Sequence, residues 1–357
     1  MHVLVTGGNG FVMAATVRQL LQECAATRVT IVDRWQPTEL VRERFREFGD
    51  RLTFTQGDVS EPDSLPDIEV THVVHGATVV WSPELEAAHA RSYLDVNIGG
   101  TVNMLEWALN RDVTRFIHVS SGDSYGRETR WSPVDSQDED GPFNPPELYA
   151  ISKYASEQVA RRYGEIFPLD VRAVRLAGIF GPMERPTPTR RYMSLSYRAV
   201  RSSIERRPLR LTARALDAGC DYISSDDVGR AILALLRTDQ LSNWVFNVAS
   251  GVRTPVPGLL ATLGEVLPGF QWRTDSEDPE FDLDPEERLA RFNAYSIARI
   301  HAETGWTPRP LADELRAYVA WVFEAPDERC PPSDYGRLSE EVSPDASSTE
   351  CWATHGS

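Results

Sequence analysis

Tyr149 and Lys153 are the residues of this sequence whose types and spacing most directly suggest chemistry. Lys153 is the single lysine among 37 basic residues, and all the others are arginine. Residues at i and i+4 share one face of a helix, so the ammonium should lie beside the phenol. A nearby cation favours phenolate and should lower the pKa of the tyrosine below about 10. The same spacing also fits an ordinary amphipathic surface, but the residues upstream favour a general acid/base.

A glycine-rich turn follows the first predicted strand and leads into an amphipathic helix. It contains Gly7 and Gly10, followed by Phe11 and Val12. Glycines let the backbone approach a pyrophosphate, whose charge is then stabilised by the N-terminus of the helix. This order of strand, glycine turn and helix predicts a dinucleotide site.

The second predicted strand ends in Asp33, which bears on the choice of dinucleotide. A carboxylate there binds the ribose 2′-hydroxyl and repels a 2′-phosphate, so the sequence predicts NAD rather than NADP, although Arg34 follows directly. Met13 stands where the glycine pattern expects a third small residue. Either the helix lies further from the sheet, or small residues such as Gly76 and Ala77 make room for it.

Short runs rich in β-branched residues alternate with helix-length amphipathic stretches through the first half of the chain. The alternation predicts an α/β fold, a Rossmann-type doubly wound parallel sheet with helices on both faces and a smaller C-terminal α/β substrate lobe. The strands are expected at His2 to Thr6, Val29 to Asp33, Leu52 to Gln56, His72 to His75, Phe116 to Ser120, Val171 to Leu176, Tyr222 to Ile223 and Val245 to Val248. Later helices are expected near Val256 to Val266, Tyr295 to Thr304 and Leu311 to Glu324.

These elements suggest three parts. We expect a dinucleotide-binding domain at residues 1–181 and 220–250, a substrate lobe at 182–219 and 251–324, and a loose tail at 325–357.

From Val3 to about Val322 the chain resembles the extended short-chain dehydrogenase/reductases, the NAD-dependent epimerase/dehydratase family. The matching stretches are Thr6 to Val12, Gly57 to Val59, His75 to Ala77, Asp95 to Thr101, Ser120 to Gly126, Tyr149 to Lys153, Arg175 to Pro182 and Tyr222 to Asp227. Their order and spacing together are highly specific for this family.

The resemblance implies roles for several residues. Ser121 would be the catalytic hydroxyl, with Tyr149 as acid/base and Lys153 also holding the nicotinamide ribose. Asp58 and Val59 would hold the adenine, the segment His75, Gly76 and Ala77 would contact the cofactor, and Asn97 would be a structural and relay residue. Relatives of this kind pair two long helices per subunit, here those ending near Asn110 and Phe167, so a homodimer is expected.

The reaction that follows hydride transfer is less well defined by the sequence. In relatives that dehydrate nucleotide sugars, Asp and Glu follow the catalytic hydroxyl, whereas here Gly122 and Asp123 do. Nucleotide-sugar epimerases usually hold the diphosphate with an Asn and an Arg at the positions of Gly178 and Cys220. A dehydratase is therefore disfavoured, and a substrate without a nucleotide fits these departures.

Nine arginines and one acid lie between residues 185 and 214, in a chain of net charge −16. Arginine forks suit phosphate or carboxylate, so an anionic substrate and an ordinary solvated helix are equally open interpretations. Arg185 and Arg191 are the substrate candidates from this segment. Trp81, Ser121, Asp123 and Gly178 complete the set of substrate candidates.

The composition limits the class of protein. Net charge −16 disfavours nucleic acid or an anionic membrane as partner, and acidic segments at 135–140 and 275–287 are expected to be solvated loops. The sequence shows no apolar run of about 18 residues and no leader, and its four cysteines fit reduced thiols, so a cytoplasmic location is expected. The cysteines have no metal-binding spacing, so no metal site is expected.

Three hypotheses follow. The first is an NAD-dependent enzyme that oxidises or reduces a secondary carbinol of a sugar-like small molecule, as a net dehydrogenase or as an epimerase. The second is a UDP- or dTDP-sugar 4-epimerase with rebuilt diphosphate contacts. The third is an NAD-binding sensor without catalysis, for which Met13 is the main support.

Overall fold

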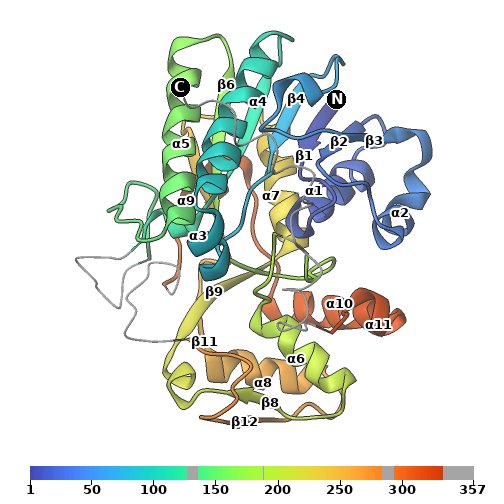
Figure 1. Ribbon diagram of the computed structural model, residues 1–357, viewed down its shortest axis with the longest axis vertical. Coiled ribbons are helices and arrows are strands. Elements are labelled where there is room, and N and C mark those ends of the chain that lie inside the picture. The colour runs from blue at the N-terminus through green and yellow to red at the C-terminus, as the bar shows by residue number, and fades with distance from the viewer. Residues whose placement is uncertain (127–135, 188, 284–292, 333–357) are drawn as a thin grey trace.

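The computed structural model describes residues 1–126, 136–187, 189–283 and 293–332. Within these ranges a seven-stranded sheet runs in the order β10-β6-β5-β4-β1-β2-β3 (Figure 1). All of its neighbouring strands pair in parallel, which confirms the predicted doubly wound sheet. The strands are β1 (His2–Thr6), β2 (Arg28–Asp33), β3 (Leu52–Gln56), β4 (His72–His75), β5 (Arg115–Ser121), β6 (Asp170–Leu176) and β10 (Val245–Val248).

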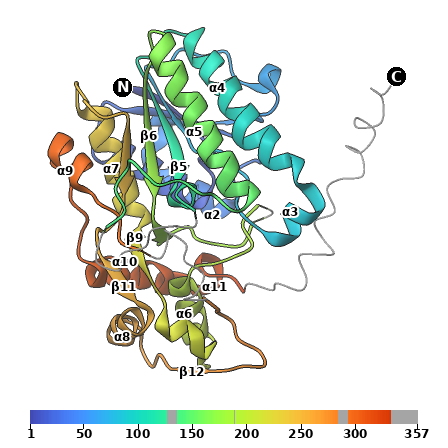
Figure 2. The same cartoon turned by 90° about the vertical axis from the view of Figure 1, so that its left-hand side faces the viewer.

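Helices cover both faces of this sheet, because alternate side chains of each buried strand enter different cores. Val3 and Val5 of β1 pack in one core with α1 (Phe11–Gln22) and α7 (Ser225–Arg237). Leu4, between them, belongs to a second core with α4 (Gly100–Leu109) and α5 (Leu148–Ile166). Figure 2 shows α4 and α5 on one side of the strands and α7 on the other.

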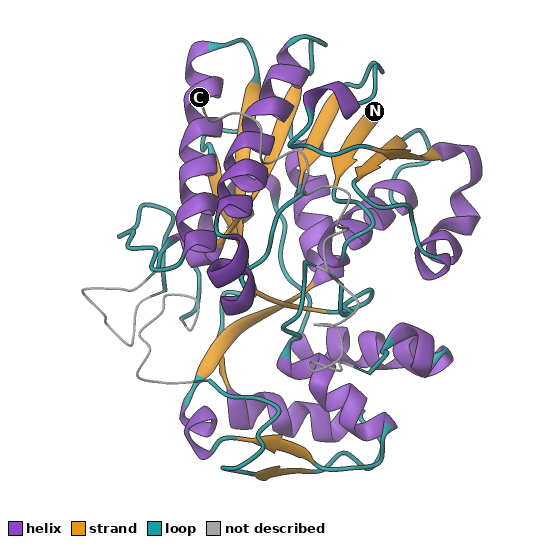
Figure 3. Ribbon diagram, in the orientation of Figure 1, coloured by secondary structure: helices purple, strands orange, loops and turns teal. Residues whose placement is uncertain are grey.

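A second group of elements lies beyond one end of the sheet, in the lower part of Figure 3. Three short strands, β7 (Gly178–Phe180), β9 (Gly219–Ser224) and β11 (Arg253–Pro255), form a sheet, and β8 (Leu209–Leu211) pairs with β12 (Trp272–Thr274). The helices of this group are α6 (Leu195–Ile204), α8 (Val256–Val266) and α10 (Leu311–Glu324). The smaller elements of the molecule are α2 (Glu39–Phe45), α3 (Pro83–His89), α9 (Ala298–Thr304), α11 (Pro326–Arg329), the π-helical η3 (Tyr93–Gly99), and the 3-10 helices η1 (Arg46–Arg51), η2 (Pro62–Ser64), η4 (Gly122–Ser124) and η5 (Ala213–Asp217).

Part of the expected tail packs against the rest of the molecule, since Cys330 and Pro331 contact α6. Cys330 is buried, its carbonyl accepts a hydrogen bond from Arg201 Nη1 at 2.8 Å, and the Tyr197 hydroxyl donates to the carbonyl of Pro331. The rest of the expected tail, 333–357, lies outside the described residues. Within the described chain no helix is both long and apolar enough to cross a membrane, and the three described cysteines form no disulfide.

Candidate active site

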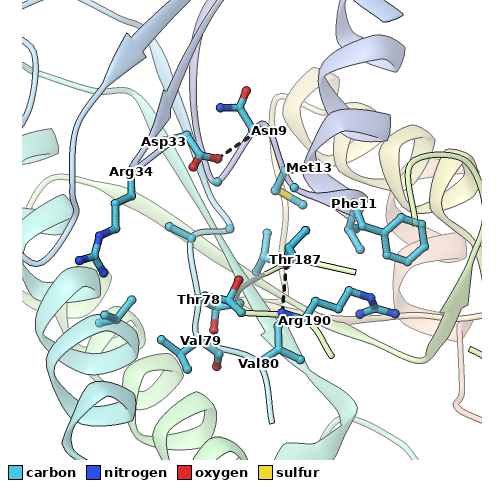
Figure 4. Close-up of a pocket in the computed structure, with 18 of the residues that line it drawn as sticks. Asn9, Phe11, Met13, Asp33, Arg34, Thr78, Val79, Val80, Thr187 and Arg190 are labelled. Atoms are coloured by element: carbon cyan, nitrogen blue, oxygen red, sulfur yellow. Dashed lines mark hydrogen bonds between the residues drawn. The ribbon is translucent and has the colours of Figure 1, made fainter. Parts of the chain in front are cut away.

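A cavity of about 800 Å³ lies at the carboxyl ends of the sheet strands. This edge is where ligands bind in doubly wound sheets, next to the point at which the strand order reverses between β1 and β4. Figure 4 shows part of the lining. Most predicted site residues line this cavity: Gly7, Gly10, Phe11, Val12, Asp33, Asp58, Val59, Gly76, Ala77, Trp81, Ser121, Asp123, Tyr149, Lys153 and Arg185.

The glycine turn brings the backbone of β1 very close to the segment after β4. Gly7 has φ +71°, and a Cβ on it would lie 3.0 Å from Ala77 N and Cα. Met13 is buried, and a Cβ on Gly76 would lie 2.3 Å from Met13 Sδ. Of the two possibilities raised by the sequence, the second is therefore present, because Gly76 makes the space that Met13 fills.

Asp33 lies at the end of β2 facing the glycine turn. Its carboxylate accepts hydrogen bonds from Asn9 N at 3.1 Å and Trp35 N at 3.2 Å, and burial raises its pKa. Arg34 is directed away from Asp33 (Figure 4) and forms an ion pair with Asp58 at 3.3 Å. The Arg34 guanidinium is thus paired with Asp58 rather than placed beside Asp33, which agrees with the preference for NAD.

The three predicted catalytic residues come together from two elements. Ser121 ends β5, its Oγ accepts a hydrogen bond from Asp123 N at 3.1 Å, and it is hydrogen-bonded to the Tyr149 phenol. One turn along α5 from Tyr149, Lys153 is buried and its Nζ donates to the Val119 carbonyl at 2.6 Å. Burial lowers the pKa of Lys153 to about 8, although Glu157 acts in the opposite direction.

The pKa of Tyr149 lies above its usual value, so the predicted lowering by Lys153 is wrong for this structure. Burial of the phenol is the largest cause, and the negative charge of Asp123 adds to it. The hydrogen bond with Ser121 and the charge of Arg190 act in the opposite direction but are weaker. Tyr149 is therefore a proton-bearing phenol at neutral pH.

Two residues predicted to contact the cofactor lie behind the cavity wall. His75 is buried between the hydroxyls of Thr6 and Thr101 at 2.8 and 3.1 Å, and burial lowers its pKa to about 3, so it is neutral and structural. Asn97 accepts from Val79 N at 2.8 Å and donates to Ser152 Oγ at 2.9 Å. Asn97 therefore joins the loop after β4 to α5, which agrees with the structural role expected of it.

Gly178 and Cys220, where relatives were expected to carry diphosphate anchors, are close neighbours in space. Gly178 pairs with Tyr222 across β7 and β9, and a Cβ on Gly178 would lie 3.8 Å from Cys220 Cβ. The same Cβ would lie 3.0 Å from the Asp221 carbonyl. Gly178 itself is not among the cavity-lining residues, although its neighbours Ala177 and Ile179 are.

Most of the arginine-rich segment is structural. All nine of its arginines are described; Arg185 and Arg190 line the cavity, and Arg191 does not. Others pair with acids of the 275–287 segment, whose described part is a loop of exposed and half-buried residues, as expected. The pairs are Arg207 with Glu280 at 2.6 Å, Arg210 with Asp278 at 2.9 Å, and Arg214 with Asp282. In the other acidic segment Glu139 is buried and ion-paired with Arg299 at 3.4 Å.

Sequence reasoning missed three residues near this site. Arg190 and Tyr192 line the cavity, and the Tyr192 ring lies 5.4 Å from the Trp81 ring. Tyr295 is buried against the turn after Ser121, where its hydroxyl would lie 2.3 Å from a Cβ on Gly122. The run of arginines between residues 185 and 214 is a signal in the sequence that includes Arg190. No local pattern in the sequence points to Tyr295.

The fold and this arrangement define a dinucleotide-binding enzyme domain with a serine, a tyrosine and a lysine at the reactive end of its pocket. The NAD dependent epimerase/dehydratase family model matches residues 3–249, and the chain belongs to that family. It is accordingly an NAD-dependent enzyme of the extended short-chain dehydrogenase/reductase type, as predicted.

Similar proteins include nucleotide-sugar enzymes of two kinds. A dTDP-glucose 4,6-dehydratase of Streptomyces griseus is 28% identical over 90% of this chain and 94% of its own length. A putative UDP-glucose 4-epimerase of Methanocaldococcus jannaschii is 24% identical over 90% of this chain and 98% of its own length. Another dehydratase, of Streptomyces niveus, is 30% identical over 52% of this chain and 56% of its own. A UDP-glucuronic acid 4-epimerase structure from Bacillus cereus, with UDP-glucuronic acid and NAD, has a TM-score of 0.75 at 21% identity and covers 91% of this chain and 99% of that one.

Proposed function

We propose that this protein is a sugar-nucleotide epimerase that oxidises one secondary carbinol and then reduces it again from the other face. The observation that carries the proposal is the Ser121, Tyr149 and Lys153 group at the inner end of a dinucleotide pocket. The relatives' names supply the nucleotide, since they are dTDP- and UDP-sugar enzymes.

The residues present fit NAD. The backbone of the glycine turn would hold the pyrophosphate, Asp33 the adenosine ribose, and Lys153 the nicotinamide ribose. Bound NAD supplies the hydride acceptor and donor. In its phenolate form, which the positive charge of the bound nicotinamide would favour, Tyr149 would take the carbinol proton as the carbonyl forms and would return it to the same oxygen. The Ser121 hydroxyl would donate a hydrogen bond to that oxygen.

Two observations favour an epimerase over the alternatives. Arg185 Nη2 donates to the Asn9 carbonyl at 2.9 Å and Nη1 to the Met183 carbonyl at 3.0 Å, so the segment after β7 is tied onto the glycine turn, as retention of NAD through turnover would require. The sensor hypothesis loses its main support, because Gly76 accommodates Met13.

A homodimer through α4 and α5 remains part of the proposal. Leu94 on η3 and Ile151 on α5 are 46% and 40% exposed, and Ile166 and Phe167 at the end of α5 are 50% and 40% exposed. Covering such side chains in a dimer would remove apolar surface from water. A cytoplasmic location also remains a prediction.

The purified protein tests the proposal directly. We expect absorbance and mass that show bound NAD, and interconversion of UDP-glucose, UDP-glucuronic acid or dTDP-glucose with the 4-epimer without added NAD. Tyr149→Phe should keep the NAD and lose turnover by roughly 10²- to 10⁴-fold. Stoichiometric NADH accumulation, a 4-keto-6-deoxy product, or full activity of Tyr149→Phe would contradict the proposal.

A further inference from the structure

Arg190 lies between the glycine turn and the catalytic tyrosine. Its guanidinium carbon is 4.9 Å from the centre of the Phe11 ring, at the N-terminus of α1, and Figure 4 shows the side chain directed toward that ring. Arg190 lines the cavity, and its positive charge acts on the Tyr149 phenol. A guanidinium at this place can reach a molecule that occupies the reactive end of the cavity.

The guanidinium is held from behind by a buried carboxylate. Arg190 Nη2 donates to Glu184 Oε1 at 2.7 Å, and Glu184 is 0% exposed. The same carboxylate accepts from Ser194 N at 2.8 Å and Ser194 Oγ at 2.6 Å, and the Arg190 backbone is fixed by Thr187 at 3.1 Å. The orientation of the guanidinium is therefore set before any ligand arrives, which reduces the entropy lost on binding.

Arg190 also has unused donor capacity. Its Nε is buried and has no hydrogen-bond partner among the described residues. Because this atom is closed to solvent, a molecule in the cavity would meet the Nη atoms. Nη2 is bonded to Glu184, and Nη1 has no hydrogen bond among the described residues. Arg185, by contrast, has donors committed to the carbonyls of Asn9 and Met183. Of the two cavity-lining arginines, Arg190 is thus the one built to receive an anion.

We propose that Arg190 binds an anionic oxygen group of the substrate, either a carboxylate on the sugar ring or the diphosphate. This inference rests on the proposed function. It also accounts for the departures at Gly178 and Cys220, because a guanidinium from the segment after β7 would replace the expected anchors.

The test compares Arg190→Gln with wild type and with Arg191→Gln, a neighbouring arginine that does not line the cavity. Calorimetry on the NAD-bound proteins would measure the dissociation constants of UDP, UDP-glucose and UDP-glucuronic acid. We expect Arg190→Gln to weaken UDP-glucuronic acid roughly ten- to hundred-fold and Arg191→Gln to change it less than about twofold. Weakening confined to UDP-glucuronic acid identifies a carboxylate site, and equal weakening of all three identifies a diphosphate site.

Two results would overturn the inference. One is an unchanged dissociation constant for all three nucleotides in Arg190→Gln. The other is weakened NAD binding with normal nucleotide binding, since the anion would then be the cofactor's pyrophosphate. If Arg190→Gln does not fold, Arg190→Lys provides the test. It keeps a positive charge toward Glu184 but lacks the paired Nη donors, so it should show a smaller loss of affinity, and unchanged affinity would also refute the inference.

Failure of the proposed function would look different. If wild type binds none of the three nucleotides and interconverts none of the sugars, the proposed function itself fails. If wild type does both and Arg190→Gln binds as wild type does, the inference alone fails.

Discussion

The contact between Met13 and Gly76 gives a quantitative prediction for Gly76→Ala. A Cβ on Gly76 would lie 2.3 Å from Met13 Sδ and 2.5 Å from its Cγ, whereas ordinary contact begins at 3.4 Å. A shift of about 1 Å is therefore needed from a side chain that is only 4% exposed. Overpacking of this kind costs about 1–3 kcal/mol, which should lower the melting temperature by several degrees.

The same substitution should weaken NAD binding. Met13 lies in the first turn of α1, whose backbone N–H groups face the expected pyrophosphate, so a displaced turn misaligns them. If about 1.4 kcal/mol of the strain falls on this turn, the dissociation constant for NAD rises about tenfold. Thermal unfolding and fluorescence titration with NAD measure the two effects.

A double mutant and a matched control make this reasoning refutable. Met13→Ala alone should cost about 2–5 kcal/mol through the cavity it leaves, and adding Gly76→Ala should recover part of that loss. Gly264→Ala is the control, because a Cβ there meets nothing within 4 Å and the residue lies within α8. Wild-type stability and NAD affinity in Gly76→Ala, or strictly additive effects in the double mutant, would refute the account.

Two further predictions concern the residues behind Tyr149. The pKa of Lys153 is about 8, so its ammonium is present below that pH and lost above it. The affinity of the apoprotein for NAD should therefore be constant below pH 7 and fall up to tenfold per pH unit above pH 8. Lys153→Met should bind weakly with no pH dependence, and a flat wild-type profile to pH 9.5 would contradict the role. Glu157→Gln removes the buried partner of Arg175, which lies 2.6 Å away, and should cost about 3–5 kcal/mol in the free energy of unfolding measured with denaturant. The exposed ion pair of Arg161 and Glu165 is the control, and Glu165→Gln should have the same free energy of unfolding as wild type. If Glu157→Gln and Glu165→Gln were equally stable, the buried pair would contribute nothing to stability.

The sheet, and the pairing of Tyr149 with Lys153 on one helix, could be predicted because their determinants are local. Strands buried on both faces, such as β1 and β10, appear as short β-branched runs, and the predictions at 2–6 and 245–248 coincide with them. The prediction at 52–56 coincides with β3, which is only partly buried. Tyr149 and Lys153 are one helical turn apart on α5, so their spacing along the chain was sufficient to expect them side by side. Ser121, which ends β5, was expected only from the resemblance to the family.

The substrate side could not be predicted in the same way, because it depends on contacts between distant segments. Arg214 pairs with Asp282, 68 residues away, and no periodicity connects them. Arg190 lines the cavity and Arg191, the substrate candidate from the sequence, does not. The residues before α6 form neither helix nor strand, so no alternation rule says which of two adjacent side chains faces the cavity. Strands of three residues, such as β8 and β12, are also too short to show a pattern.

The glycine after Ser121 shows how such a distant contact restricts the chemistry. A carboxylate at position 122 would need a Cβ that lies 2.3 Å from the Tyr295 hydroxyl and 3.1 Å from the Leu176 carbonyl. Tyr295 is fixed by stacking on Tyr125 at 5.6 Å and by its backbone N–H, which donates to Asp221 at 3.1 Å. The acid of a dehydratase therefore has no room here, because a tyrosine from the C-terminal part of the chain occupies its place. Of the two residues that follow Ser121, only Asp123 carries a carboxylate, and it lines the cavity together with Tyr149. The absence of a carboxylate at position 122 is what supports the proposed epimerisation over elimination.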